Sequence, residues 1–184
     1  MFPPDVVATS PPIPDSYWVV PSLLLAGAYP GSPDDRRAEA RVARFVDAGI
    51  RTFLNLTEDT EPLVPYAPIV DMLAAEAGVA CKCIRYPIKD HGVPTRTLAQ
   101  EILAAIRSEI DAGRPVYVHC WGGVGRTGTI IGCWLVEQGV ACDEAIGRIA
   151  TLRRGVPGAW MQSPEMDEQR AFVSAWRAPQ RAVD

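Results

Sequence analysis

The residues that could do chemistry gather in the segment 116–129, which reads VYVHCWGGVGRTGT. His119 and Cys120 follow a short apolar run, a glycine-rich stretch comes next, and Arg126 and Thr127 open a segment with helical spacing. Glycines let backbone N–H groups turn toward a common centre, and a helix N-terminus behind them adds positive potential. The planar fork of Arg126 can hold two oxygens of one phosphate. The pattern predicts an anion-binding loop.

Cys120 stands at the start of this loop, where inward N–H dipoles and a nearby cation favour the thiolate form. A thiolate beneath a bound phosphate is in line to attack phosphorus. The alternative interpretation is a buried structural cysteine beside a glycine-rich turn.

HCWGGVGRT resembles the signature loop of the cysteine-dependent protein tyrosine phosphatase superfamily, which is His-Cys, five residues, Arg, then Ser or Thr. The resemblance implies that Cys120 is the nucleophile and that Arg126 and the loop backbone hold the phosphate. It implies that His119 hydrogen-bonds the loop backbone and keeps the thiol ionised, and that Thr127 aids breakdown of the phospho-enzyme. The loop residues expected to bind phosphate are Trp121, Gly122, Gly123, Val124, Gly125 and Arg126, with Trp121 at the floor or rim of the pocket.

Asp90 lies 30 residues before Cys120, in PIKDHGVP, a segment similar to the family's general-acid loop. The leaving oxygen needs a proton, and the attacking water must later lose one. Classical members have Trp-Pro-Asp here, whereas this chain has Ile88-Lys89-Asp90, so the loop hinge differs. The alternatives are that Asp90 is an ordinary turn carboxylate or that His91 is the acid.

Gln162 and Gln169 lie in the segment where relatives carry a water-positioning glutamine. The spacing differs from theirs, and a surface amide near a capped helix start is the competing interpretation for both.

The elements that must position these residues alternate along the chain. Short apolar runs predict strands, and i, i+3, i+4 apolar spacing with glycine stops predicts helices. The predicted strands are 17–20, 23–26, 50–56, 79–86 and 115–118. The first predicted helix begins at 32–35 and ends before Gly49. The other predicted helices cover 66–77, 95–112, 127–138, 143–154 and 163–176. This order indicates an α/β fold, a single domain with a central, mostly parallel sheet flanked by helices, of the dual-specificity phosphatase type.

The 184 residues fit one domain. We expect a Pro-rich tail over 1–15, the phosphatase domain over 16–178 and a tail over 179–184. A net charge of −4 argues against nucleic-acid partners, and no apolar run is long enough for a membrane span. Five cysteines without a signal peptide indicate a cytoplasmic protein with reduced thiols. In addition to Cys120 these are Cys81, Cys83, Cys133 and Cys142, any of which could be redox-regulatory.

These observations predict a cysteine-dependent phosphatase acting through a phospho-cysteine intermediate, of the protein tyrosine or dual-specificity kind, without metal or cofactor. Its partner would be a phosphorylated protein or a small phosphomonoester. The uncharged side chains of the loop favour a substrate with one phosphate, although Lys82, Arg85 and Lys89 could restore positive charge at the mouth. The alternatives are an inositol-phosphate or phosphoinositide phosphatase, a phospho-binding pseudophosphatase, and a rhodanese-like sulfurtransferase. The sequence leaves the oligomeric state open.

Overall fold

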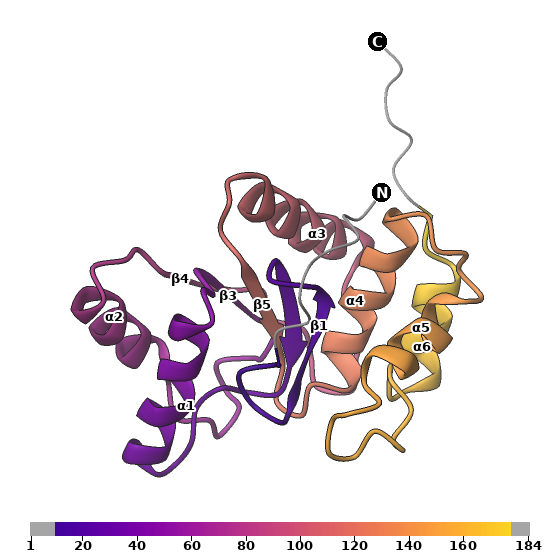
Figure 1. Ribbon diagram of the computed structural model, residues 1–184. Helices are drawn as coiled ribbons and strands as arrows, with labels where there is room; N and C mark the ends of the chain where they lie inside the picture. The colour runs from indigo at the N-terminus through magenta and orange to yellow at the C-terminus, as the bar shows by residue number, and fades with distance from the viewer. Residues whose placement is uncertain (1–9, 178–184) are drawn as a thin grey trace.

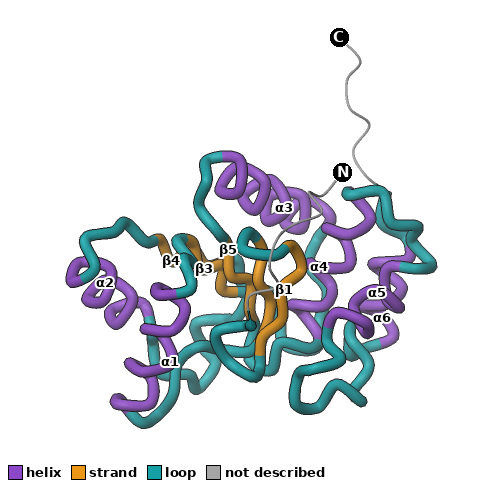
Figure 2. Tube along the Cα trace, viewed as in Figure 1, coloured by secondary structure: helices purple, strands orange, loops and turns teal. Residues whose placement is uncertain are grey.

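A five-stranded sheet runs through the middle of the protein in the computed structural model, which describes residues 10–177 (Figures 1 and 2). The strand order is β1-β2-β5-β3-β4, with β1 antiparallel to β2 and the other neighbours parallel. The predicted α/β fold with a mostly parallel sheet is confirmed. The strands are β1 (Ser16–Val20), β2 (Leu24–Gly27), β3 (Thr52–Asn55), β4 (Lys82–Arg85) and β5 (Val116–His119).

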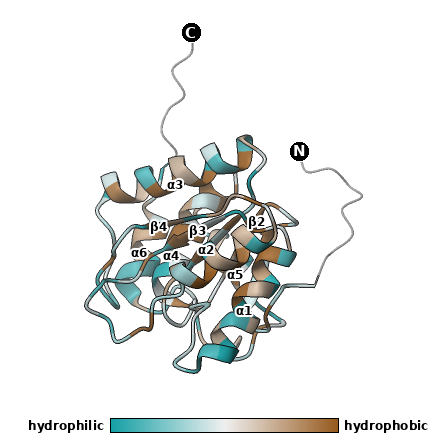
Figure 3. Ribbon diagram, turned by 90° about the vertical axis from the view of Figure 1, so that its left-hand side faces the viewer, coloured by the Kyte–Doolittle hydropathy of each residue, from teal (hydrophilic) through white to brown (hydrophobic). Residues whose placement is uncertain are grey.

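Helices cover both faces of this sheet. One face carries α1 (Asp35–Asp47) and α2 (Ala67–Glu76), and the other carries α3 (Arg96–Asp111), α4 (Gly125–Glu137), α5 (Ala145–Leu152) and α6 (Asp167–Ser174) (Figure 1). Figure 3 shows the apolar stripes of α1 and α3, whose opposite sides are hydrophilic. These two helices therefore bury one stripe and leave the other side in water, whereas α4 is buried along nearly its whole length and α6 packs against α4 and α5.

The core is divided between these two faces because successive strand residues point in opposite directions. In β5, Val116 and Val118 join the cluster under α3 and α4, while Tyr117 joins the cluster under α1 and α2. A parallel strand covered on both sides must be apolar throughout, which explains why residues 116–118 are a continuous apolar run.

Most elements begin or end one or more residues away from the predicted bounds; α4, for example, begins at Gly125 and not at 127, and β3 covers 52–55 and not 50–56. The N-cap of α1 is Asp34, whose side chain accepts from the Arg37 N–H, so the helix begins after Ser32 and Pro33. The last helix begins at Asp167, with Met166 as its N-cap, and Ser163 and Pro164 precede it. The fourth strand is limited to residues 82–85, where it pairs with β3.

The arrangement brings the carboxyl ends of β2, β3 and β5 to one edge, since Gly27, Asn55 and His119 are matched across the ladders. Ligands of parallel α/β sheets bind in the crevice beyond these ends. The loop that follows β5 starts there, at Cys120.

Candidate active site

The loop between β5 and α4 forms a tight cradle around Cys120, which is 3% exposed. α4 begins at Gly125 with no side-chain cap, so its first N–H groups are free to face the loop. Gly123 has φ of 70°, and a Cβ there would lie 2.4 Å from the carbonyl carbon of Gly27. Only glycine fits this position, and the cradle depends on its close approach to β2.

Arg126 closes the cradle from beneath, with its guanidinium almost wholly buried. Nη1 donates to the Ile88 carbonyl at 3.1 Å, and Nη2 lies 3.0 Å from Glu61 Oε2 and 2.9 Å from Asp90 Oδ1. Nη1 also pairs with the other Glu61 oxygen. Burial favours a lower pKa for Arg126, but these carboxylates outweigh burial and raise it. A permanent positive charge is thus held in fixed orientation.

Glu61 is the partner that fixes Arg126, and the sequence analysis did not identify it. Burial alone would raise the pKa of Glu61, but its hydrogen bonds to Arg126 outweigh burial and lower it. Its Oε1 also accepts from the Glu58 N–H at 2.7 Å, which ties the loop after β3 together. The only signal for this role in the sequence was an acidic run after a strand, and spacing gave no way to choose among its members.

Asp90 reaches the same cavity from the loop after β4. Its carboxylate is about half exposed, and its backbone N–H donates to Glu58 Oε2 at 3.2 Å. His91 lies beside it with φ of 58°, its Nε2 3.5 Å from Asp90 Oδ2 and its Nδ1 3.9 Å from Glu165 Oε2. Asp90 and His91 both border the cavity, but only Asp90 contacts Arg126.

His119 lies behind the cradle and is fully buried. Nδ1 is 3.2 Å from the Cys120 carbonyl, which can only accept, so Nδ1 carries the proton. Nε2 then accepts from the Tyr66 hydroxyl at 2.7 Å. Burial lowers the pKa of His119 to about 3. The ring is therefore neutral near pH 7 and orients the loop backbone, as the family resemblance suggested.

The other three residues predicted for the site, Thr127, Gln169 and Gln162, lie in different environments. The Thr127 hydroxyl is buried and has no hydrogen-bond partner within residues 10–177. Gln169 is buried against the loop: its Nε2 donates to the Gly92 carbonyl at 2.8 Å, and a Cβ on Gly125 would lie 2.9 Å from its Oε1. Gln162 is exposed and does not border the cavity. Neither glutamine borders the cavity, but Gln169 packs against the loop at Gly125, where its Oε1 also accepts from the Met166 N–H at 3.1 Å.

The cavity above the cradle has a volume of about 250 Å³. Its wall contains two further residues that the sequence analysis missed, Arg153 and Glu165. Arg153 is 2% exposed; Nη1 donates to the Met161 carbonyl at 2.9 Å, and the buried Nε has no partner in the described part of the chain. Because Arg153 and Arg154 are adjacent in sequence, only burial shows which of the two faces the cavity.

None of the three expected basic residues, Lys82, Arg85 and Lys89, borders this cavity. Lys82 pairs with Glu109 of α3 at 3.0 Å, and Arg85 lines a separate pocket. A strand directs alternate side chains to opposite faces, and neither position of β4 faces the cradle. Trp121 is 46% exposed, so it belongs to the rim and not to the floor.

Within residues 10–177, no group of three or more His, Cys, Asp or Glu side chains is placed to hold a metal ion. The helices of that same range are all too short or too polar to cross a bilayer.

Comparison with known proteins gives one family match over residues 14–182, to a family described as Swiss Army Knife protein, DSP-PTPase phosphatase domain. The triple specificity protein phosphatase PtpB of Mycobacterium tuberculosis is 28% identical over 73% of the chain and 54% of its own length. The phosphatase PTEN1 of Arabidopsis thaliana, named as a phosphatidylinositol 3,4,5-trisphosphate 3-phosphatase and protein-tyrosine-phosphatase, is 31% identical over 50% of the chain and 22% of its own length. The chain thus spans about half or less of these relatives.

The fold matches solved structures as well. The crystal structure of Tk-PTP in the active form superposes with a TM-score of 0.67 and 23% identity, covering 87% of this chain and 94% of that one. At this identity the likeness establishes the fold.

Proposed function

We propose, from the premise that this chain belongs to the DSP-PTPase family of cysteine-dependent phosphatases, that it hydrolyses phosphate monoesters through a phospho-cysteine intermediate. The observation that carries the proposal is the meeting of three groups in one cavity: a buried Cys120 at the centre of the cradle, a fixed Arg126, and the Asp90 carboxylate. Cys120 and Arg126 come from one segment, the β5–α4 loop and the start of α4, and the fold brings Asp90 to them from the loop after β4.

In the first step the Cys120 thiolate attacks phosphorus and the ester P–O bond breaks. Arg126 and the loop N–H groups stabilise the charge on the three non-bridging oxygens. Protonated Asp90 gives its proton to the leaving oxygen. The products are the phospho-cysteine and an alcohol or phenol.

In the second step a water molecule attacks the phospho-cysteine. Asp90, now a carboxylate, takes the proton of that water, and the S–P bond breaks to release phosphate and the thiolate. Gln169 lies against Gly125 and is therefore the glutamine that we assign to water positioning. Thr127 follows Arg126 at the start of α4, and its unpartnered hydroxyl is assigned to the departing sulfur.

The rim of the cavity favours phosphoprotein substrates. Four large apolar residues with exposed side chains lie close in sequence to residues that border the cavity, at most two positions away. They are Val93, Trp121, Trp160 and Met166. Trp160 is 87% exposed, and aromatic side chains of this kind anchor protein partners. Glu165 at the mouth repels additional phosphates. These features support a protein tyrosine or dual-specificity phosphatase.

Arg153 is the observation that favours the alternative, a phosphatase for inositol phosphates or phosphoinositides. Its guanidinium borders the cavity, has no carboxylate partner within residues 10–177, and could bind a second anionic group of the substrate. The two candidate functions therefore differ in which wall of the cavity contacts the part of the substrate beyond its reacting phosphate.

The proposal extends to the setting of the enzyme. Five free cysteines support a reducing compartment, the cytoplasm. We assign residues 16–178 to the phosphatase domain; most of the proposed tails, 1–15 and 179–184, lies outside the described residues. The substrate is a phosphorylated protein or small phosphomonoester.

The test is phosphate release from an aryl phosphate, phosphotyrosine and phosphoserine peptides, and an inositol polyphosphate, all with EDTA present. Wild type should release phosphate, and Cys120→Ser should lose at least 10³-fold in kcat, about 4 kcal/mol, while still binding vanadate-like phosphate analogues. Cys83→Ser, which removes an exposed thiol remote from the cradle, is the control and should keep full activity.

The outcomes separate the candidates. Faster turnover of the peptides supports the phosphoprotein reading, and faster turnover of the inositol polyphosphate supports the alternative. Binding without release from any substrate would instead indicate a pseudophosphatase, and sulfur transfer from thiosulfate to cyanide would indicate a sulfurtransferase.

A further inference from the structure

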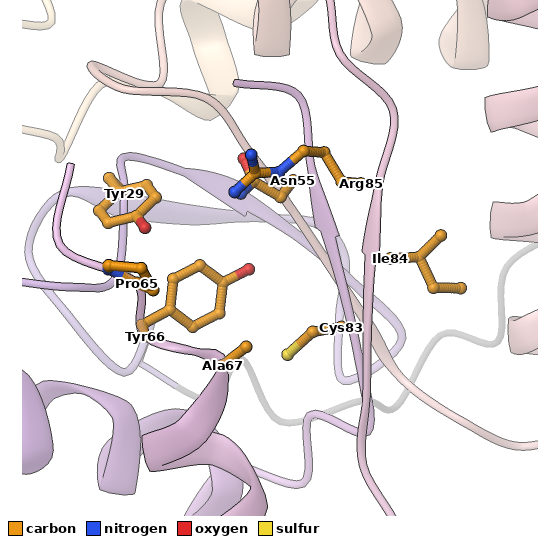
Figure 4. Close-up of a pocket in the computed structure, with 8 residues that line it drawn as sticks. All are labelled: Tyr29, Asn55, Pro65, Tyr66, Ala67, Cys83, Ile84 and Arg85. Carbon is orange, nitrogen blue, oxygen red and sulfur yellow. The ribbon is translucent and has the colours of Figure 1, made fainter. Parts of the chain in front are cut away.

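A second pocket lies at the same edge of the sheet as the catalytic cavity but shares no lining residue with it. Its volume is about 130 Å³, and it opens between the carboxyl ends of β3 and β4 and the N-terminus of α2. Figure 4 shows the residues that line it: Tyr29, Asn55, Pro65, Tyr66, Ala67, Cys83, Ile84 and Arg85. At ~30 Å³ per water molecule, it holds a small ligand and not a drug-sized one.

Arg85 gives this pocket its charge. The guanidinium makes no ion pair and no hydrogen bond with any residue in the range 10–177, although most arginines on this protein make at least one. No carboxylate is among the lining residues. The pocket therefore presents a free cation.

Asn55 adds an unused donor beside that cation. It is 5% exposed, and the ladder places it directly opposite Arg85 on the neighbouring strand. Its Oδ1 accepts from both the N–H and the hydroxyl of Thr57, at 2.9 and 2.7 Å. Nδ2, on the other side of the carboxamide, has no partner among the described residues. Although most of the residue is buried, Nδ2 is accessible at the pocket, so water or a ligand can accept from it.

The N-terminus of α2 supplies a third favourable group. Tyr66 occupies the N-cap position, but its side chain makes no hydrogen bond to the N–H groups of the first turn. Ala67, the first residue of the helix, lines the pocket. Pro68 has no N–H, and the Ile69 and Val70 N–H groups donate to the Tyr66 carbonyl at 3.0 and 3.1 Å, so within residues 10–177 the Ala67 N–H is the donor of this first turn that remains for a ligand. The remaining wall is made by the rings of Pro65, Tyr29 and Tyr66, while the side chain of Ile84 points away from the pocket toward the other face of the sheet (Figure 4).

We propose that this pocket is a binding site for a small organic anion whose carboxylate or phosphate group accepts from Arg85 and Asn55. The rings of the remaining wall contact the rest of the ligand. The site is distinct from the phosphate cradle but adjoins it, because Tyr66 in its wall donates to His119 behind Cys120. A ligand in this pocket would contact Tyr66, which hydrogen-bonds His119, the residue that orients the catalytic loop.

The experiment is an amide and side-chain NMR titration of the full-length Arg126→Ala variant, in which loss of the arginine blocks anion binding at the catalytic cradle. Inorganic phosphate and malonate are the two probes, and they separate a phosphate from a carboxylate ligand. We expect saturable shifts of the Asn55 side-chain NH₂ and of the Ala67 and Arg85 amides with at least one probe. The stronger binder identifies the anion.

Three variants, each made in the Arg126→Ala background, test the assignment. Arg85→Ala should weaken binding at least tenfold, because it removes the charge. Asn55→Asp keeps the acceptor for Thr57 but replaces the donor by a carboxylate, so it should abolish binding. Arg148→Ala removes another exposed arginine, on α5, and should leave binding unchanged. Shifts that do not saturate with either probe, or that persist in Arg85→Ala with its fold intact, would overturn the proposal. Because the cradle is blocked and no turnover is measured, the result is independent of the proposed activity.

Discussion

At the scale of single residues, the site depends on how carboxylates hold one buried arginine. Glu61 binds both terminal nitrogens of Arg126, while Asp90 contacts only Nη2. This division suits their proposed tasks, since the arginine must stay fixed while the acid must exchange a proton. The half-exposed Asp90 is free to change partners when a phosphate occupies the cradle.

Glu61→Gln tests this division, because it preserves shape but removes the charge that fixes Arg126. We expect kcat/KM for an aryl phosphate to fall about tenfold, about 1.4 kcal/mol of transition-state stabilisation. Asp59→Asn, an exposed neighbour in the same loop, is the matched control and should behave as wild type. Steady-state kinetics of the two variants measure the effect, and equal values for them would show that Glu61 does not position Arg126.

His119 gives a second prediction at this scale. Its pKa is lowered by burial to about 3, below its ordinary value of 6.5. The folded protein therefore keeps the ring neutral while the unfolded chain takes up a proton below pH 6.5, so His119 makes stability fall as the pH drops from about 6.5 toward 3. An NMR titration should show no change of the His119 ring between pH 5 and 8. Titration of His119 in that range would contradict the neutral, donating tautomer.

At the scale of elements, a buried carboxylate holds α3 to the sheet. Glu109 on α3 accepts from Thr52 of β3 at 2.8 Å and from Lys82 of β4 at 3.0 Å, and it pairs with Arg114 just before β5. These bonds join one helix to three successive strands. The hydrogen bond from Arg114, opposed by burial and helped by Thr52 and Lys82, lowers the pKa of Glu109 to about 2.

The stability contributed by Glu109 is present above its unfolded pKa of about 4.5 and is lost as the pH falls toward 2. Glu109→Gln should therefore lower the free energy of unfolding by ~1–3 kcal/mol at pH 7, with the difference from wild type shrinking below pH 4. Urea unfolding at pH 7 and pH 3 measures it, with the exposed Glu101→Gln of the same helix as control. A difference that stays constant with pH would mean that the charge of Glu109 is not the stabilising feature.

At the scale of the whole molecule, the catalytic cavity draws on segments that are far apart in the chain. Asp90, Cys120, Arg153 and Glu165 border one cavity, and Glu61 reaches it through Arg126. A ligand in the cradle therefore stabilises contacts between both halves of the chain and couples to global unfolding.

Vanadate at 100 times its Kd should add ~2.7 kcal/mol to stability, which for a chain of this length raises Tm by ~5–10 °C. Differential scanning calorimetry measures the shift. Arg126→Ala should abolish it, while Arg148→Ala, an exposed arginine on α5, should retain it. An unshifted Tm in wild type would exclude the cradle as a tight anion site.

The sequence by itself determined the elements and the cradle, because both depend on local patterns. A strand, five loop residues and a helix start are contiguous in 116–127, so the spacing of Cys120 and Arg126 is set by the chain alone. The same holds for Asp90, whose separation from Cys120 matches the family's pattern. Local apolar periodicity likewise predicted the five strands and six helices, with errors only at their ends, where caps such as Asp34 compete with neighbouring residues.

Tertiary structure decided every partner that comes from a distant segment. Glu61 could be distinguished from Glu58 and Asp59 only when the loop after β3 folded over Arg126. Burial separated Arg153 from Arg154 and Gln169 from Gln162, and pairing with α3 drew Lys82 away from the cavity. The pocket of Arg85 and Asn55 exists because two strands are in register at their ends. Contacts of this kind depend on sheet order and side-chain direction, which a linear pattern does not contain.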